Sequence, residues 1–432
     1  MWAIVDCDNF FCSCERVFRP DLRHKPLVVF SNNDGCVVAR SKESKAMGVQ
    51  MGTPWYQAQD LFRGRGLVAF SSNYVLYADL SSRVMAVLRQ EAPEVLQYSI
   101  DESFLNLNGF MPEQGLKKWG EELAQKVQKW TGIPVSIGMA PTKTLAKVAV
   151  RYAKEYAGYN KCCIIGDERQ RLIALQGLEI EDVWGIGHRM THWLKGQGKV
   201  TAADFAAMPR ELICSRYGIV GERTWQELNG NDMHTELDTL EAPRKSFMTG
   251  CSFPKMLTDF DDVRTHVANY AARCAAKLRR QNSVCSLLTV FVDSNYFRED
   301  LEQYHSQASW YFPTPTNDSG EIVSTAVECL KACFRRGIHY KPASAMVSGF
   351  STASAIQPDL FSFNPEQAER LRTLGMVLDD INRTQGADTV VLASQQYALR
   401  EKDGKSIKYV NAIRRAYKSP DYSTRPDSFK VK

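Results

Sequence analysis

Two adjacent acids, Asp101 and Glu102, lie in a run whose apolar residues alternate with small polar ones, as in a half-buried strand. Neighbouring strand side chains point to opposite faces, so both carboxylates reach one site only at a turn or a strand end. Asp6 ends a second short apolar strand. Three carboxylates on one sheet edge would repel one another without a cation, and hard divalent cations prefer oxygen ligands. The pattern predicts a two-metal site for phosphoryl chemistry, with an exposed acidic turn as the alternative.

Basic residues follow on a predicted helix from Pro141 to Lys154, which Thr142 would cap. Four of them fall within one narrow sector of that helix: Lys143, Lys147, Arg151 and Lys154. A one-sided basic face beside a metal site suits a triphosphate or a DNA backbone, whereas the alternative is a solvated helix face. Three further basic residues lie near the short helix expected at 41–47: Arg40 just before it, and Lys42 and Lys45 on it. For these residues, phosphate binding and solvent exposure are about equally favoured.

A glycine hairpin occurs at Gly185 and Gly187, between two predicted short helices. The backbone N–H groups of such a loop, at the start of a helix, can hold a phosphate. Glycine at this spacing also serves simply to turn the chain, so the flanking helices are what favour a DNA-binding role.

The composition of the whole chain is that of an ordinary globular protein. Its 432 residues suggest about three domains, and 44% of them are hydrophobic. The net charge is only +5, so any nucleic-acid role depends on local basic surface. No apolar run is long enough to span a bilayer, and the N-terminus lacks the basic start of a signal peptide, so we expect a cytoplasmic protein without membrane partners. The twelve cysteines show no zinc-type spacing and are expected to be buried thiols.

The elements that must position these residues alternate between strand and helix. In the first part we expect strands at 2–6, 26–30, 37–40, 98–104 and 134–140, and helices at 10–17, 41–47, 73–92, 116–130 and 141–154. This order is typical of a βαββαβ-like layered fold with the three acids on one edge.

A linker is expected at 236–246, followed by a second compact unit. Its predicted strands and helices again follow a βαββαβ order, at 246–252, 262–280, 286–292, 308–312, 321–335 and 343–350. Arg273 and Lys277 lie near the end of its first helix and could contact DNA. After residue 350 come an isolated Leu-Phe pair, an amphipathic helix at 366–381 and a basic tail from Arg400, which we expect to be mobile or ordered by a partner.

Together these blocks resemble the Y-family DNA polymerases, most closely those of the UmuC type. The resemblance covers nearly the whole chain and rests on the opening strand with Asp6, residues 31–36 (SNNDGC), 70–74 (FSSNY), 98–102 (YSIDE), 142–147 (TKTLAK), 183–187 (VWGIG) and the Arg-rich tail. No single block is specific, but their number and order are.

The resemblance implies an α+β, right-hand polymerase fold. The ferredoxin-like palm would hold residues 1–20 and 75–165, and the small fingers 21–74. A helical thumb with a helix-hairpin-helix would span 166–235 and a linker 236–246. The βαββαβ little finger would span 247–350, followed by a partner-binding extension at 351–432.

By the same resemblance, Asp6, Asp101 and Glu102 would be catalytic and would bind two Mg²⁺ ions together with the Cys7 carbonyl. Phe10, Phe11, Lys45 and Lys154 fall where the family binds the incoming nucleotide, and Phe11 occupies the position that excludes ribonucleotides. Lys45 stands where some members carry Arg, so a single ammonium replaces a guanidinium that could donate two parallel hydrogen bonds. Phe11 stands where the UmuC type has Tyr, so the contact of the tyrosine hydroxyl is absent here. Gly185, Gly187, Lys143, Lys147, Arg273 and Lys277 are the expected DNA contacts.

The implied activity is error-prone, DNA-directed DNA synthesis across lesions in the SOS response, without proofreading. The implied partners are primed damaged DNA, deoxynucleotides, a cleaved UmuD-type dimer and a RecA filament. Gln357, Leu360 and Phe361 are similar to peptides that bind the bacterial sliding clamp. A palm-fold nucleotidyl cyclase and a non-catalytic DNA-binding scaffold remain alternatives, although neither accounts for all of these features.

Overall fold

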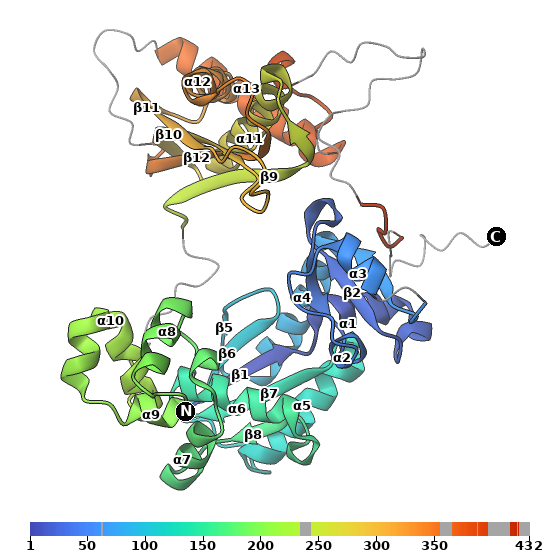
Figure 1. Cartoon of the computed structure of the whole chain (residues 1–432), viewed down its shortest axis with the longest axis vertical. Coiled ribbons are helices and arrows are strands. Elements are labelled where there is room, and N and C mark those ends of the chain that lie inside the picture. The colour runs from blue at the N-terminus through green and yellow to red at the C-terminus, as the bar shows by residue number, and fades with distance from the viewer. Residues whose placement is uncertain are drawn as a thin grey trace. The chain divides into compact units, whose positions relative to one another are not determined.

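The computed structural model describes residues 1–61, 64–233, 243–354, 365–386, 388–395, 415–420 and 422. The chain forms two compact units (Figure 1). The first comprises Met1–Ala242 together with Ala416–Lys432, and the second comprises Pro243–Arg415. Within the described ranges, no helix combines the length and apolar character needed to cross a bilayer.

The first unit is built on a five-stranded sheet with β1 at its centre. Its strands, in spatial order, are β5 (Glu94–Gln97), β6 (Glu102–Asn106), β1 (Trp2–Cys7), β7 (Val135–Ala140) and β8 (Cys162–Ile164). The helices that pack on or beside it are α1 (Phe10–Phe18), α4 (Tyr74–Glu91), α5 (Leu116–Thr131) and α6 (Lys143–Glu155). Strand β1 pairs antiparallel with both β6 and β7, and five of its six residues are buried, because helices cover both faces of the sheet.

Strand β1 separates two hydrophobic cores because alternate side chains point to opposite faces. Ala3 and Val5 belong to the core that α4 and α5 cover. Trp2 and Ile4 belong to the core on the α6 side. The same period of two places Asp6 on the α6 face of the sheet.

Gly138 in β7 allows α6 to lie directly on the sheet. A Cβ at Gly138 would come within 2.1 Å of the Val150 backbone nitrogen and 2.3 Å of the Ala146 carbonyl oxygen. As the sequence predicts, Thr142 caps the helix by accepting a hydrogen bond from the Leu145 N–H at 3.2 Å. The basic side chains of α6 are therefore held close to the strand that carries Asp6.

A second, smaller sheet and a set of helices complete the first unit. The small sheet has the order β3 (Val37–Arg40), β2 (Leu27–Phe30), β4 (Val68–Ser71), and it is accompanied by α2 (Lys42–Ala46) and α3 (Trp55–Leu61). The helical part comprises α7 (Glu168–Gln176), α8 (His188–Gly196), α9 (Ala202–Ala206) and α10 (Arg210–Leu228). Its apolar residues join the core under α6, so the helical part is packed against the α6 side of the main sheet.

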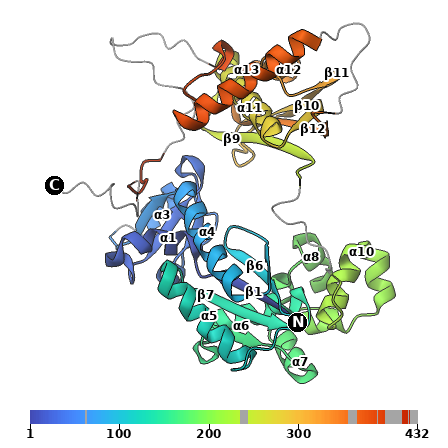
Figure 2. The ribbon, with the colours of Figure 1, turned by 180° about the vertical axis from the view of Figure 1, so that it is seen from behind.

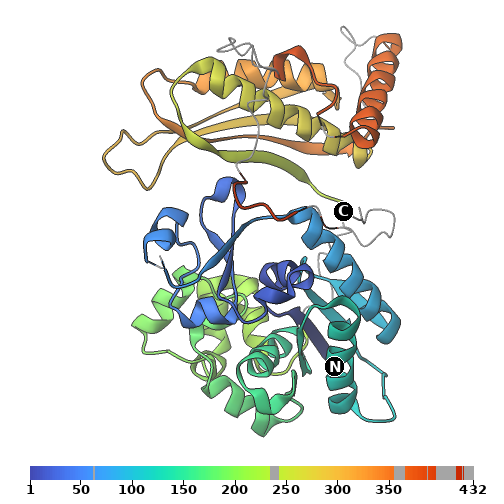
Figure 3. The ribbon, with the colours of Figure 1, turned by 90° about the vertical axis from the view of Figure 1, so that its right-hand side faces the viewer.

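The second unit confirms the predicted βαββαβ order. It runs β9 (Ser246–Leu257), α11 (Phe260–Arg280), β10 (Ser283–Ser294), β11 (His305–Thr316), α12 (Ser319–Cys333) and β12 (Tyr340–Thr352). The strands form one antiparallel sheet in the order β11-β10-β12-β9, with the two helices on one of its faces (Figure 3). Helix α13 (Pro365–Thr384), which contains the predicted amphipathic helix, lies beside α11 (Figure 2).

Three expectations about the elements differ from the structure. The strand expected at 98–104 is strand only from residue 102, because residues 98–101 form the turn between β5 and β6. The tail is not wholly mobile or dependent on a partner, because residues 416–420 and 422 pack against the first unit, where Tyr417 and Ser419 form specific hydrogen bonds. The first of the two short helices predicted around the glycine hairpin is only a 3₁₀ turn, at Ile180–Asp182. Residues 236–242 of the predicted linker and the whole Leu-Phe segment at 357–361 lie outside the described residues.

Candidate active site

Three predicted acids meet at one end of the main sheet. Asp6 on β1 lies directly opposite Glu102 on β6 in the antiparallel register. Just before β6, the Asp101 carbonyl oxygen accepts a hydrogen bond of 2.9 Å from the Cys7 N–H. The turn that carries Asp101 is therefore tied to the end of the strand that carries Asp6.

Ser99 shapes this turn. Its hydroxyl oxygen accepts hydrogen bonds from the N–H groups of Asp101 and Glu102, at 3.2 and 3.0 Å. The hydroxyl also donates to the Asp101 carboxylate at 2.6 Å. A serine at this position satisfies two backbone donors and fixes the direction of the Asp101 side chain.

Two lysines of α6 pair with the other two carboxylates. The Lys154 ammonium lies 2.5 Å from an Asp6 carboxylate oxygen, and the Lys147 ammonium lies 3.0 Å from both oxygens of Glu102. The lysines are seven residues apart, which is about two helical turns and so places them on one face of α6. Asp6 and Glu102 are thus neutralised by two ammonium groups of α6, the helix that packs on their face of the sheet.

Burial raises the pKa of Asp6 to about 7, against the opposing effect of Lys154. The nearby carboxylates of Glu102 and Asp101 raise it further. The ionised form of Asp6 is therefore unfavourable in this environment, and an additional cation would stabilise it.

The residue types fit magnesium, because the donor set is acidic and consists of oxygen atoms only. Among the residues that the structure describes, no three Asp, Glu, His or Cys side chains are grouped as a ready ligand set for a metal ion. Lys154 and Lys147 hold two of the carboxylates instead. Metal binding at Asp6 or Glu102 thus competes with these ion pairs.

Cys7 and Asp8 follow Asp6 at the end of the strand. Burial, then the charges of Asp6 and Asp101, raise the pKa of the Cys7 thiol, so its sulfur stays neutral and only its carbonyl oxygen suits a hard cation. Asp8 accepts hydrogen bonds from the Ser136 hydroxyl at 2.9 Å and from the Lys161 ammonium at 2.7 Å. Asp8 was not among the predicted site residues, and these partners assign it to fixing the strand end.

A cluster of positive charge lies next to Asp6. Burial and the like charges of Arg40 and Lys154 lower the pKa of Lys45. Arg40 donates to the Val49 carbonyl at 2.7 Å, while its buried Nε has no hydrogen-bond partner within the described chain. Lys45 and Lys154 are thus electrostatically coupled across two separate elements, which is the arrangement expected where an anion binds. The sequence left Arg40 undecided between phosphate binding and solvent exposure.

Phe10 and Phe11 have different environments. Phe10 is buried in the core that α4 covers, and its contact with a nucleotide stays a prediction. Phe11 is partly exposed and stacks on Tyr77, with ring centroids 4.5 Å apart and planes 15° apart. Tyr74 meets the edge of the Phe11 ring at 5.8 Å.

The prediction of a DNA-facing basic face on α6 is wrong for Lys143, whereas DNA contact by Lys147 stays a prediction. Lys143 is fully buried with its ammonium 3.7 Å from the centroid of the Trp2 ring. Lys147 is held by Glu102 and lies over the Tyr98 ring at 4.7 Å. The face turns toward the sheet because aromatic and acidic partners there hold the ammonium groups more strongly than a solvated surface would.

The glycine hairpin has the expected shape. Gly185 has φ +92°, and a Cβ there would lie 2.7 Å from the Thr224 hydroxyl, so both the backbone and the packing require glycine. Gly187 precedes α8 and has open space around it. The backbone of this loop remains a predicted phosphate contact. The hairpin is anchored by Trp184, whose indole N–H donates to the Tyr98 hydroxyl at 3.3 Å.

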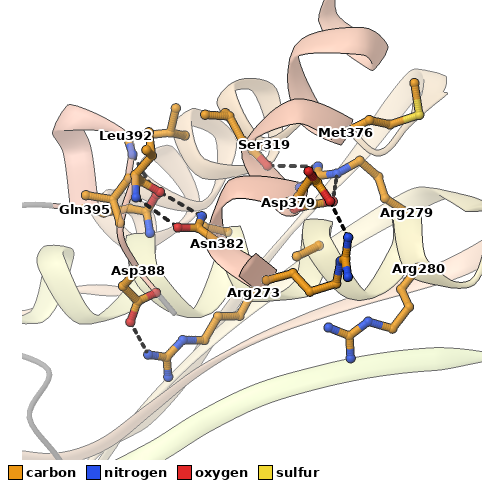
Figure 4. A pocket seen from close by; sticks show the side chains of 17 residues that line it. Arg273, Arg279, Arg280, Ser319, Met376, Asp379, Asn382, Asp388, Leu392 and Gln395 are labelled. Atoms are coloured by element: carbon orange, nitrogen blue, oxygen red, sulfur yellow. Dashed lines mark hydrogen bonds and ion pairs between the residues drawn. The ribbon is translucent and has the colours of Figure 1, made fainter. Parts of the chain in front are cut away.

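In the second unit, the predicted DNA contacts Arg273 and Lys277 have protein partners. Arg273 lies 3.2 Å from Asp388, and Lys277 donates to the Thr249 hydroxyl at 3.0 Å. Arg273 also lines a cavity of about 600 Å³, in which Arg279 donates two hydrogen bonds to the Asp379 carboxylate, at 2.7 and 2.8 Å. Figure 4 shows these side chains together. These carboxylates partly neutralise the basic end of α11, and DNA contact by Arg273 and Lys277 stays a prediction.

Ser99, Arg40 and the C-terminal residues are features that the sequence analysis did not assign to the site. Ser99 could have been found from its position two residues before an acid at a turn. No local sequence pattern could have predicted the contacts of the C-terminal residues, because these contacts join positions more than 340 residues apart.

Comparisons with known proteins agree with this arrangement. The description "impB/mucB/samB family" fits residues 5–151, and that of its C-terminal domain fits residues 244–360. The chain is 38% identical to Protein UmuC of Salmonella typhimurium over the full length of both, and 37% identical to Protein ImpB of the same species over 89% of this chain and 91% of that one. It is also 31% identical to DNA polymerase IV of Corynebacterium diphtheriae over 62% of this chain and 58% of that protein.

Among solved structures, a Y-family DNA polymerase chimera, Dbh-Dpo4-Dbh, matches 82% of this chain and 100% of its own, with a TM-score of 0.64 and 21% identity. An insertion ternary complex of Dbh DNA polymerase matches the same shares with a TM-score of 0.52 and 20% identity. At this level of identity the likeness establishes the fold, which is the predicted right-hand polymerase architecture.

Proposed function

Because the chain belongs to the impB/mucB/samB family, we propose that it is an error-prone, DNA-directed DNA polymerase that copies damaged templates. The observation that carries the proposal is the meeting of Asp6, Asp101 and Glu102 at one sheet end, beside the cationic residues Lys45 and Lys154. Nucleotidyl transfer needs both parts, since acids bind metal and cations bind the triphosphate. The SOS response is the proposed setting.

The acids would hold two Mg²⁺ ions, with the Cys7 carbonyl as an additional ligand. Magnesium, when bound, supplies activation of the primer 3′-hydroxyl and neutralises charge on the triphosphate. Asp101 is the carboxylate that Ser99 orients, and Asp6 is the one whose burial makes an added cation most favourable. The pairing of Lys154 with Asp6 would give way to the metal, which frees the ammonium for the triphosphate.

Lys45 and Lys154 would stabilise the triphosphate and the departing pyrophosphate, and Arg40 is positioned to add to them. Phe11 would lie against the sugar, where its ring leaves no room for a 2′-hydroxyl. Its stacking on Tyr77 supports this role because it keeps the ring in one orientation.

The domain roles follow from the same family. We assign 1–20 and 75–165 to the palm, 21–74 to the fingers, 166–235 to the thumb, 236–246 to the linker and 247–350 to the little finger. Primed damaged DNA and deoxynucleotides are the proposed substrates, and the cytoplasm is the proposed location. A cleaved UmuD-type dimer, a RecA filament and the sliding clamp are proposed partners of the extension at 351–432. A nucleotidyl cyclase is not favoured, because the family match continues through the second unit.

Primer extension tests the proposal directly. The purified full chain is incubated with primed template, Mg²⁺ and deoxynucleotides, using undamaged DNA and DNA with one abasic site, with and without a cleaved UmuD-type dimer and RecA filament. We expect extension across the lesion that stops in chelator. Accumulation of cyclic nucleotide without DNA would instead support the cyclase, and duplex binding without extension in every mixture would support the scaffold.

A further inference from the structure

The C-terminal segment of residues 416–420 and 422, here called the strap, docks on the small sheet of the first unit (Figures 1 and 3). Tyr417 fits its ring against Trp55 and Phe30, with centroids 5.4 and 6.2 Å away, and its hydroxyl accepts a hydrogen bond of 3.1 Å from the Trp55 indole N–H. The ring contributes to a core made by β2, β3 and α3. Tyr417 therefore anchors the strap in an apolar site.

The backbone of the strap is held as specifically as its side chains. The Ser71 N–H donates to the Tyr417 carbonyl at 3.1 Å, and the Tyr417 N–H donates to the Ser71 hydroxyl at 2.9 Å. The Ala416 N–H donates to the Asp34 carboxylate at 2.8 Å, whose other oxygen accepts from Ser71 at 2.5 Å. Paired backbone groups distinguish a specific docking from a loose apolar contact.

Ser419 carries the contact further, toward α1 and α4. It is buried, and its hydroxyl accepts a hydrogen bond from the Asn73 amide at 3.1 Å and donates to the Glu15 carboxylate at 3.3 Å. Asn73 is also the cap of α4. Beyond Ser419, Tyr422 stacks on Phe18 at the end of α1, with centroids 4.4 Å apart and planes 5° apart.

Glu15 links the strap to Phe11. The same carboxylate oxygen that accepts from Ser419 accepts from the Tyr77 hydroxyl at 2.7 Å, and Tyr77 is the ring on which Phe11 stacks. The other oxygen of Glu15 is buried and has no hydrogen-bond partner in the described part of the chain. Burial also raises the pKa of Glu15. A buried carboxyl with so few donors depends on each of them, so loss of one shifts its partners.

We propose that the strap positions the Phe11 ring through Ser419, Glu15 and Tyr77, and thereby sets how strictly the polymerase excludes ribonucleotides. The proposal rests on the proposed function, and within it Ser419, Glu15 and Tyr77 are positioning residues that do not touch the nucleotide. Release of the strap lets the Tyr77 ring, and Phe11 with it, move away from the sugar. The C-terminal end of the chain thus tunes selection at its N-terminal end.

The test compares five full-length single variants by the ratio of kcat/KM for deoxynucleotide over ribonucleotide incorporation. Tyr417→Ala removes the anchor, and Ser419→Ala and Tyr77→Phe each remove one hydroxyl of the relay. Tyr417→Phe is the matched control, because it keeps the anchoring ring and loses only the hydroxyl. Phe11→Ala serves as the reference for lost discrimination.

We expect Tyr417→Ala and Ser419→Ala to lower the ratio roughly tenfold by raising ribonucleotide use, since small misplacements near a reacting centre have effects of this size or larger. Deoxynucleotide incorporation should change much less, and Tyr417→Phe should resemble wild type. The double variant of Ser419→Ala with Tyr77→Phe should lower the ratio no further than the stronger of the two single variants, because both substitutions act through Glu15. If the strap only stabilises the fold, the strap variants would lower kcat/KM for both kinds of nucleotide equally and leave the ratio unchanged.

Amide hydrogen exchange provides a second readout that needs no activity. In the wild-type chain, we expect the amides of segments 10–18 and 68–77 to be protected from exchange. In the Tyr417→Ala variant, we expect this protection to be lost. Unchanged protection there would overturn docking, and lost protection with an unchanged sugar ratio would overturn positioning. If the wild-type chain incorporates no nucleotide at all, the proposed function fails, and altered exchange of segment 10–18 in Ser419→Ala still decides whether the strap holds the helix of Phe11.

Discussion

The side chain of Asp101 differs from those of the other two acids in having a hydroxyl partner in place of a lysine. Ser99 orients it, whereas Asp6 and Glu102 are paired with ammonium groups. Asp101→Asn keeps the shape and removes the charge. We expect primer extension to fall by several orders of magnitude while duplex binding persists, since the basic second unit is unchanged. Single-turnover extension and a binding titration measure the two effects, and extension within tenfold of wild type would remove Asp101 from the site.

Asp6 connects function to stability through its raised pKa. Its pKa of about 7 in the folded chain compares with an ordinary value of 3.8, so the folded state binds this proton more tightly than the unfolded state does. The free energy of unfolding therefore falls as the pH rises from about 4 to about 7. In chelator at pH 8, Asp6→Asn should unfold at a temperature higher by about 2–4 °C or more, although it is inactive.

The gap between Asp6→Asn and wild type should narrow toward pH 5, where wild-type Asp6 is already protonated in the fold. Added Mg²⁺ should stabilise wild type more than the variant, because the ion binds only the ionised carboxylate well. Thermal unfolding at the two pH values measures both effects. A variant that is less stable than wild type at pH 8 would show that the pair with Lys154 outweighs burial.

At the scale of elements, α13 presents apolar side chains on a face that the described residues of the second unit leave exposed. Leu374 and Val377 are each 51% exposed, whereas Leu378 is half-buried beside the cavity near Arg279. The helix itself is fixed to α11 by the bidentate pair of Arg279 with Asp379. This face is our proposed docking site for the cleaved UmuD-type dimer.

Leu374→Asp combined with Val377→Asp should abolish co-purification with such a dimer, because it places two charges in an apolar contact. Arg372→Asp, on the opposite side of the same helix, is the control that adds negative charge elsewhere. Pull-down with tagged dimer measures the effect. Binding retained by the double variant, with its unfolding midpoint unchanged, would assign the face to another role.

At the scale of the whole molecule, the chain leaves the first unit before residue 243 and returns to it by residue 416. Helix α13 and the segment with Gln357, Leu360 and Phe361 therefore lie between two attachments to the same unit. We propose that this segment binds the sliding clamp. Burial of Leu and Phe would contribute roughly 1.5–3 kcal/mol each, which suits a weak tether.

Leu360→Ala combined with Phe361→Ala should leave distributive synthesis on short primers intact and abolish stimulation by a loaded clamp. Primer extension with and without clamp and its loader measures both. The strap variant Tyr417→Ala is a useful comparison, because it alters sugar selection and should keep clamp stimulation. If the clamp still fully stimulates primer extension by the Leu360→Ala, Phe361→Ala variant, the segment is a linker and does not bind the clamp.

The sequence by itself determined the acids of the site and most of the elements around them, although it missed α3, β4, β5 and β8. The positions of β1, α6 and α11 follow from apolar periods of two and 3.6 residues and from caps such as Thr142, all of which are local properties of the chain. Asp6 opposite Glu102 follows once two neighbouring strands are paired.

Only the tertiary structure decided what the side chains of the site contact. Lys143 and Lys147 have the spacing of an exposed basic face, yet Trp2 and Glu102 lie opposite them and turn them inward. The strap reads as a disordered basic tail, yet Tyr417 and Ser419 bond to residues about 346 positions away. Contacts at such separations depend on which surfaces packing brings together, and no local pattern of residues encodes that choice.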